Sequence, residues 1–112
     1  QVEDQAALPA QEKQARAAAS GDLAAVIGES YYNYGDYQKS IELLNLAIQK
    51  GITGKLKAVP NKSQAQLILG TAQTASGQLE AAKATFSDIS GANEQALAQL
   101  WIAFIDSKSA AQ

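Results

Sequence analysis

The sequence predicts an all-α fold made of antiparallel helical hairpins, with about six helices. Three observations predict this class: apolar residues recur at spacings of three and four, Gly interrupts the pattern at turn positions, and the whole pattern repeats at an offset of 42 residues, for example from Gly28 to Gly70. The matched pairs are Ile27-Gly28 with Leu69-Gly70, Gly35 with Gly77, Tyr37 with Leu79, Ser40 with Ala82, Leu44 with Phe86 and Ala47 with Ile89.

The first hairpin is predicted at residues 21–50. Its first helix has an apolar face at helical spacing, and Gly35-Asp36 then supplies a stop and an N-cap for the second helix. The second helix continues the stripe and ends at Gly51. The residues of the two stripes are Ala24, Ile27, Gly28 and Tyr31, then Tyr37, Ser40, Ile41, Leu44, Ala47 and Ile48.

The second hairpin is predicted at residues 63–91, after a connector at 51–62 that contains two Gly and a Pro. Gly77 separates its two helices, as Gly35 does in the first hairpin, and Gly91 ends the copy. The apolar positions are Leu67, Leu69, Gly70 and Ala72, then Leu79, Ala82, Phe86 and Ile89.

The segments IGESYYNYGDYQKSIELLNLAI and LGTAQTASGQLEAAKATFSDI resemble the consensus of the tetratricopeptide repeat family. The resemblance covers about residues 22–91, and the arrangement looks like the C-terminal region of bacterial tetratricopeptide-containing proteins. It implies a short right-handed superhelix that binds other proteins within a larger bacterial protein. In this pattern Gly28 and Gly70 let paired helices approach closely. The second copy departs from it at Gln73 and Leu79, where aromatic residues are usual.

Two further helices are expected at the ends. Residues 92–108 predict a strongly amphipathic capping helix, with Trp101 as its anchor on the last repeat. At the other end, Pro9 precedes the Ala-rich segment from Gln11 to Ala19, which suits a helix start, and residues 1–8 are expected to be frayed. The apolar side predicted for the capping helix comprises Ala96, Leu97, Leu100, Trp101, Phe104 and Ile105.

The resemblance also implies a concave groove that binds a peptide or a helix. Tyr32 is its most prominent residue, since Tyr offers amphipathic contact area at a low entropy cost. Chaperone-binding members of the family carry a basic clamp at these positions, and this sequence has no Lys or Arg there, so an acidic C-terminal tail is not the expected ligand. The groove residues would be Asp22, Ala25, Glu29, Tyr32, Asn33, Gln64, Leu67, Thr71 and Thr74.

Two other functions stay open. The first is a structural or dimerisation cap without a separate ligand, since an apolar face at the end of a repeat array is either capped or paired. The second is a catalytic or hard-metal site at Asp22, Glu29 and Asp36, although exposed helix carboxylates are common and Asp36 is explained as an N-cap. The face for self-association or capping would comprise Leu97, Trp101 and Phe104.

The composition limits the number of domains and the kinds of catalytic or metal site that the chain can form. With 112 residues and 46% hydrophobic content, the chain is long enough for one modest core, so a single domain is expected over residues 9–112. The chain has no His and no Cys, which excludes Ser-His and Cys-His nucleophiles and leaves only carboxylates as metal ligands. We therefore expect a protein that is not an enzyme and has no cofactor.

Charge and hydropathy indicate which partners and which cellular location to expect. A net charge of −2 gives no electrostatic reason for a nucleic-acid partner. The longest uncharged stretch, from Ser63 to Leu79, is interrupted by polar residues and Gly, so no membrane insertion is expected. The absence of Cys and the single Arg slightly favour a bacterial periplasmic or cell-envelope protein over a cytoplasmic one.

Overall fold

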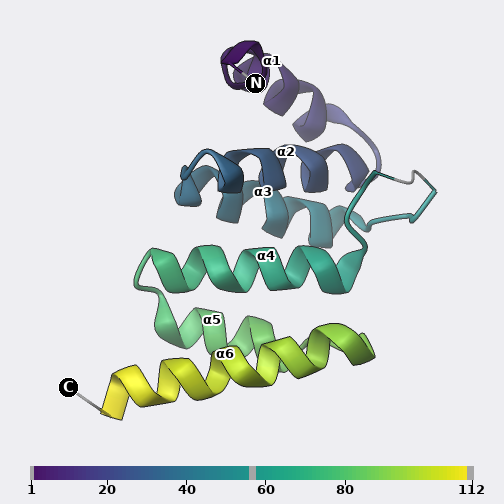
Figure 1. Ribbon diagram of the computed structural model, residues 1–112. Coiled ribbons are helices and arrows are strands. Elements are labelled where there is room, and N and C mark those ends of the chain that lie inside the picture. Colours follow the sequence, from purple (N-terminus) through teal and green to yellow (C-terminus); the bar gives the residue numbers. More distant parts are fainter. Residues whose placement is uncertain (1, 56–57, 111–112) are drawn as a thin grey trace.

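In the computed structural model, the described residues, 2–55 and 58–110, form six α-helices and no strand (Figure 1). The predicted all-α class is therefore confirmed for this part of the chain. The helices are α1 (Val2–Ala17), α2 (Asp22–Asn33), α3 (Tyr37–Lys50), α4 (Lys62–Ala75), α5 (Leu79–Ser87) and α6 (Ala92–Ala110).

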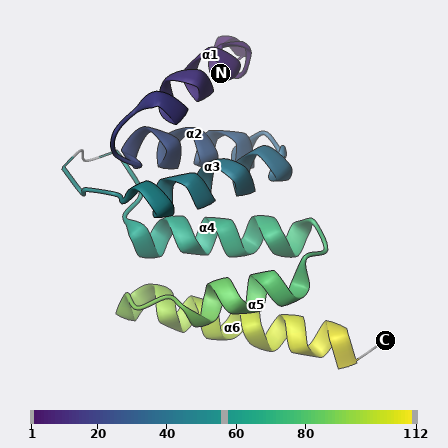
Figure 2. The same cartoon turned by 180° about the vertical axis from the view of Figure 1, so that it is seen from behind.

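The helices stack in chain order. Each one packs against the next, so that α2 with α3 and α4 with α5 form two hairpins, and α6 follows as a single helix. Helix α4 also contacts α2, and α6 also contacts α4. Figure 1 shows α2, α4 and α6 on the near side, whereas Figure 2 shows α3 and α5 from the opposite side. Three helices from successive units thus share one face.

Residues that are 42 positions apart make equivalent contacts in the two hairpins. A Cβ atom added to Gly28 would lie 2.8 Å from Cγ of Leu44, and one added to Gly70 would lie 2.5 Å from Cε1 of Phe86. These distances are too short for a side chain, so in both hairpins the first helix meets the second at a Gly. The same register also places a small residue opposite Gly28, where the Ser40 hydroxyl donates to its backbone carbonyl over 2.8 Å.

The turns inside the two hairpins are alike. Gly35 has a φ of 83° and Gly77 a φ of 81°, a left-handed backbone conformation that favours Gly after a helix end. After the first turn, the Asp36 side chain caps α3 by accepting a hydrogen bond from the backbone N–H of Lys39 over 3.2 Å. Both turns are therefore determined by local sequence.

The buried side chains form three clusters along the stack, each between neighbouring helices. This arrangement is typical of repeat proteins, in which each unit contacts only its neighbours. The first cluster comprises Leu8, Ala15, Ala24, Ala25, Ile27, Tyr31, Leu43 and Ala47. The second comprises Ile41, Leu44, Ala65, Leu69 and Ala72, and the third comprises Ala82, Phe86, Ile89, Ala98 and Ile105.

The N-terminal segment differs from the prediction. Helix α1 begins at Val2, and Leu8 is only 2% exposed because it packs in the first cluster. Residues 2–8, which the sequence analysis expects to be frayed, belong to this helix, while Gln1 lies outside the described residues. Pro9 lies inside the helix and removes one backbone hydrogen bond, while Leu8 and Ala15, on either side of it, are buried in the first cluster.

Helix α6 also differs from the prediction, because its apolar residues occupy two sides. Ala98 and Ile105 are fully buried, and they pack with Phe86 in the third cluster. Leu100 and Phe104, which were expected on the covered side, are exposed. The small side chain of Ala98 lets α6 approach α4 and α5 closely. The side of α6 that carries Ala98 and Ile105 is therefore the side that these helices cover.

Candidate functional site

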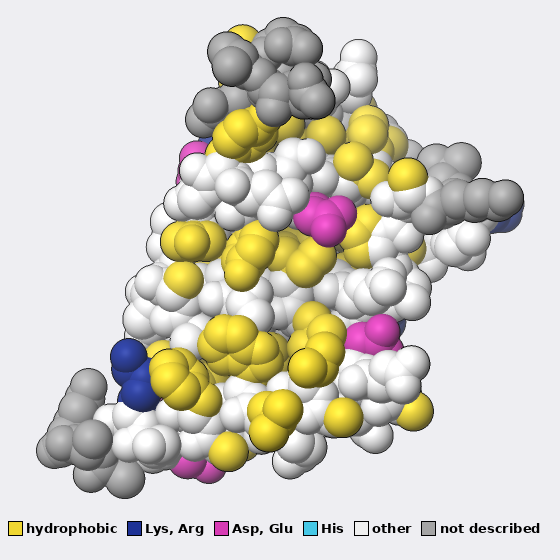
Figure 3. Space-filling view, in the orientation of Figure 1, with side chains coloured by type: hydrophobic (Ala, Val, Ile, Leu, Met, Phe, Trp, Pro, Cys, Tyr) yellow, Lys and Arg dark blue, Asp and Glu magenta, His cyan; other side chains and the backbone are white. Residues whose placement is uncertain are grey.

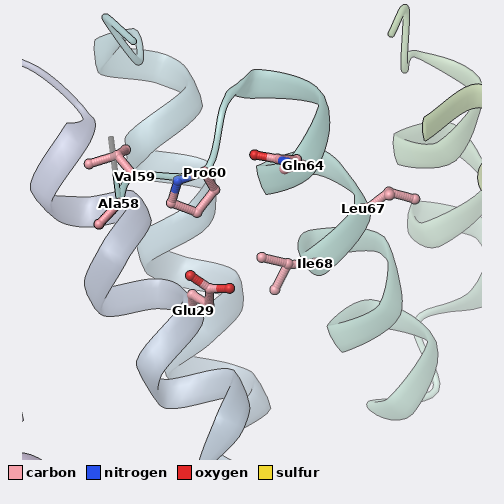
Figure 4. A pocket seen from close by; sticks show the side chains of 7 residues that line it. All are labelled: Glu29, Ala58, Val59, Pro60, Gln64, Leu67 and Ile68. Carbon is pink, nitrogen blue, oxygen red and sulfur yellow. The ribbon is translucent and has the colours of Figure 1, made fainter. Parts of the chain in front are cut away.

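An open groove of about 350 Å³ lies between α2, the connector and α4 (Figure 4). Three of the nine predicted groove residues are brought together there, one from α2 and two from α4. The lining residues are Glu29 of α2, Ala58, Val59 and Pro60 of the connector, and Gln64, Leu67 and Ile68 of α4.

The first part of the connector is anchored to the N-terminal end of α2. The Asp22 carboxylate accepts one hydrogen bond from the Thr53 backbone N–H over 2.7 Å and another from the Thr53 hydroxyl over 2.5 Å. These hydrogen bonds hold the pKa of Asp22 below its ordinary value. Beside them, the Gly21 N–H donates to the Gly51 carbonyl over 2.8 Å. The connector is therefore attached to the hairpin that it leaves.

A capping box determines where the connector ends. The Asn61 side chain accepts from the Gln64 backbone N–H over 2.8 Å, and the Gln64 side-chain oxygen accepts from the Asn61 N–H over 2.9 Å. Helix α4 thus begins at Lys62, directly after the capping residue Asn61, and Pro60 before it is buried. Residues 58–60, directly before this capping box, form one wall of the groove.

The groove combines an apolar surface with one carboxylate. Figure 4 shows Glu29 and Ile68 facing each other from α2 and α4, with Pro60 above Glu29 and Leu67 turned to the other side of α4. Glu29 is half-buried, and no residue of the described chain forms a hydrogen bond or an ion pair with its carboxylate. A ligand with a basic group beside an apolar side chain matches this combination.

Other predicted groove residues are in different environments. Asp22 and Ala25 are buried, so neither is available to a ligand, and Asp22 instead anchors the connector. Asn33 is exposed at the end of α2, away from the groove lining. The hydroxyls of Thr71 and Thr74 donate over 2.8 Å to backbone carbonyls three and four residues earlier in their own helix. Their donor protons are therefore already used.

Tyr32 does not line the groove. Its ring lies 5.6 Å from the ring of Tyr37, inclined at 59°, and it packs on the second core cluster. Half-buried in this way, it contributes to packing between the hairpins. The apolar contact expected from Tyr32 is offered instead by Ile68 and the connector, which the sequence pattern did not single out. Pro60 next to the capping residue Asn61 was the signal that a wall of defined geometry precedes α4.

A second surface lies on α6. The Trp101 ring stacks on Phe86 at 5.7 Å and meets Phe104 edge-on at 5.8 Å. Leu100, Trp101 and Phe104 line a shallow, mainly apolar hollow of about 320 Å³. The structure thus brings together the predicted residues Trp101 and Phe104, and Leu97 lies one turn before Trp101 on the same side of the helix.

Within residues 2–55 and 58–110, no group of three or more acidic side chains is arranged to hold a metal ion. In the same part of the chain, no helix combines the length and the hydropathy that crossing a lipid bilayer requires.

Comparisons with known proteins identify no relative. No protein-family model matches the chain, and no match was found among curated proteins or among solved structures. The resemblance to tetratricopeptide repeat proteins therefore stays a prediction, and the function has to be inferred from the geometry of the chain itself.

Proposed function

We propose that this chain is a protein-interaction module of the tetratricopeptide type that holds a peptide segment in the groove between α2 and α4. The segment carries a large apolar side chain next to a Lys or Arg. The observation that carries this proposal is the half-buried Glu29 carboxylate, which has no partner among the described residues and faces Ile68 across the groove. No catalytic role is proposed for the groove, because Glu29 is the only ionisable residue among the described residues that line it.

Charge and apolar contact would play different parts in binding. An ion pair at a partly exposed carboxylate contributes only about 0.2–1 kcal/mol, so Glu29 acts mainly on selectivity. Affinity comes from covering Val59 and Ile68, which are both partly exposed, at about 25 cal/mol for each Å² of apolar surface removed from water. A groove of about 350 Å³ accommodates one or two side chains, which fits a short peptide of moderate affinity.

Selection from a random peptide library displayed on phage tests this proposal. The immobilised wild-type chain is expected to select peptides in which Lys or Arg adjoins a large apolar residue. Glu29→Lys is expected to weaken binding of these peptides by about tenfold or more, since it replaces attraction by repulsion. Ile68→Glu is expected to abolish binding, because it places a second charge on the apolar surface.

Glu80→Lys provides the matched control. Glu80 is exposed on α5, outside the groove, so this variant makes the same change of net charge at a distance. It is expected to bind the selected peptides as the wild type does. Selection of no peptide, or selected peptides that bind equally well to the Glu29→Lys variant, would refute the proposal.

A further inference from the structure

We infer that α6 is the contact surface for a second copy of this chain, with the two α6 helices antiparallel about a two-fold axis close to Trp101. This interface is separate from the groove between α2 and α4, so it does not depend on the proposed peptide binding.

The inference begins with the apolar side of α6 that the fold leaves uncovered. Leu97 is 50% exposed, Leu100 is 68% exposed and Phe104 is 49% exposed, and these are the exposed large hydrophobic residues of the described chain. Spacings of three and four place all three on one side of the helix, with Trp101 at its edge. The near face of the molecule shows hydrophobic side chains gathered over its lower part, where α6 runs (Figure 3). Exposed apolar surface concentrated on one helix is typical of an interface.

The charges at the two ends of this stripe indicate that its partner is a second copy of the chain. Glu94 lies seven residues before Trp101 and Lys108 lies seven residues after it, so both share its side of the helix. The Lys108 ammonium is 5.5 Å from the centre of the Phe104 ring, directly at the end of the apolar stripe. The stripe is therefore acidic at its N-terminal end and basic at its C-terminal end.

Such a stripe is complementary to a reversed copy of itself. In an antiparallel pair centred near Trp101, Glu94 of each chain faces Lys108 of the other, while Leu97 faces Phe104 and Leu100 faces Trp101. A parallel pair would instead bring like charges together at both ends, which is unfavourable. The antiparallel arrangement also places each helix N-terminus beside a C-terminus, as the helix dipoles favour. A two-fold pair of this kind closes on itself.

The expected dimer is weak. Helix α6 has 19 residues and is therefore about 28 Å long, so one helix pair covers less than the ~1,600 Å² of a standard protein interface. We expect a reversible monomer–dimer equilibrium with a dissociation constant on the order of micromolar.

Sedimentation velocity over a range of protein concentrations tests the interface. The wild type is expected to change from monomer to dimer as concentration rises, whereas Leu100→Glu combined with Phe104→Glu is expected to remain monomeric. Since both side chains are already exposed, this variant should keep the wild-type circular dichroism spectrum. A wild type that is monomeric at every concentration overturns the inference, as does a double variant that dimerises normally.

Charge exchange tests the antiparallel direction. Glu94→Lys alone and Lys108→Glu alone are each expected to weaken the dimer, because each brings two like charges together at both ends of the pair. Combining the two substitutions restores opposite charges and is expected to restore dimerisation. Glu80→Lys on α5 is the control and should leave the dimer unchanged. A combined variant that is no better than the single ones overturns the two-fold arrangement.

Cross-linking gives a second readout of direction, since the chain contains no Cys. Chains with Glu94→Cys are mixed with chains with Lys108→Cys and oxidised. Antiparallel pairing is expected to join one chain of each kind, whereas parallel pairing would join like chains and would contradict the inference. Circular dichroism of each reduced variant verifies that the fold is retained.

Discussion

The phenolic hydroxyl of Tyr31 donates a hydrogen bond to Oε1 of Glu12 over 3.1 Å, in a buried position where α1 meets α2. The other oxygen of Glu12 accepts from Arg16 at 2.7 and 2.9 Å and from the Lys39 ammonium at 2.9 Å. The carboxylate of Glu12, a residue that is only 9% exposed, therefore joins α1 to both helices of the first hairpin. The first helix is fixed by this contact as well as by its apolar side chains.

Replacing Glu12 by Gln is expected to lower the free energy of unfolding by about 1–3 kcal/mol, because hydrogen bonds to a charged acceptor are lost at a buried site. Urea denaturation followed by circular dichroism measures this change. Glu42→Gln is the control: Glu42 also pairs with Arg16, over 2.9 Å, but its side chain is 54% exposed. Its effect should stay within about 1 kcal/mol. Equal effects of the two variants would contradict a special role for Glu12.

Stability is expected to fall in acid because of the same carboxylate. Burial alone would raise the pKa of Glu12, but hydrogen bonds from Lys39, Arg16 and Tyr31 outweigh it, so the pKa lies below the ordinary value of 4.5. The stabilisation is thus complete above pH 4.5 and is lost as pH falls through the lower pKa of the folded state. Urea midpoints between pH 7 and pH 3 should fall more steeply for the wild type than for Glu12→Gln. Parallel curves would be evidence against this linkage.

Gly28→Ala is expected to destabilise the first hairpin by about 1–3 kcal/mol, since the new Cβ would lie 2.8 Å from Cγ of Leu44. This loss opposes the gain of about 1 kcal/mol that Ala normally brings to a helix interior. Thermal or urea unfolding measures the sum. In a double-mutant cycle, Leu44→Ala should cost less in the Gly28→Ala background than in the wild type, because it also relieves the contact. Strictly additive effects would show that the two residues do not meet.

Asp22→Ala is expected to release the connector, since it removes the acceptor of both Thr53 hydrogen bonds. Limited digestion with trypsin should then cleave faster after Lys55, and mass spectrometry of the fragments locates the site. Thr53→Ser retains both donors and serves as the control, with cleavage at the wild-type rate. If Asp22→Ala is digested no faster than the wild type, Asp22 does not anchor the connector.

The two hairpins could be predicted because their signals are local and repeated. The close approaches of Gly28 to Leu44 and of Gly70 to Phe86 follow from helical spacing on either side of a turn Gly. The groove could be predicted only in part. Glu29, one of the residues that the resemblance implied, lines the groove, but the wall at Pro60 depends on how a long connector folds back. Helical periodicity carries no information about that path.

The sequence by itself determined the helices, their pairing and the turns, since a 3.6-residue period, turn glycines and caps act over a few residues. Only the tertiary structure decided how each helix is used. In the folded chain Asp22 and Ala25 are buried, and Tyr32 packs beside Tyr37. Helix α1 continues through Pro9, and Leu100 of α6 is exposed. The physical reason is that burial depends on which neighbour a side chain meets, and that neighbour is often distant in sequence, as Glu12 is from Lys39.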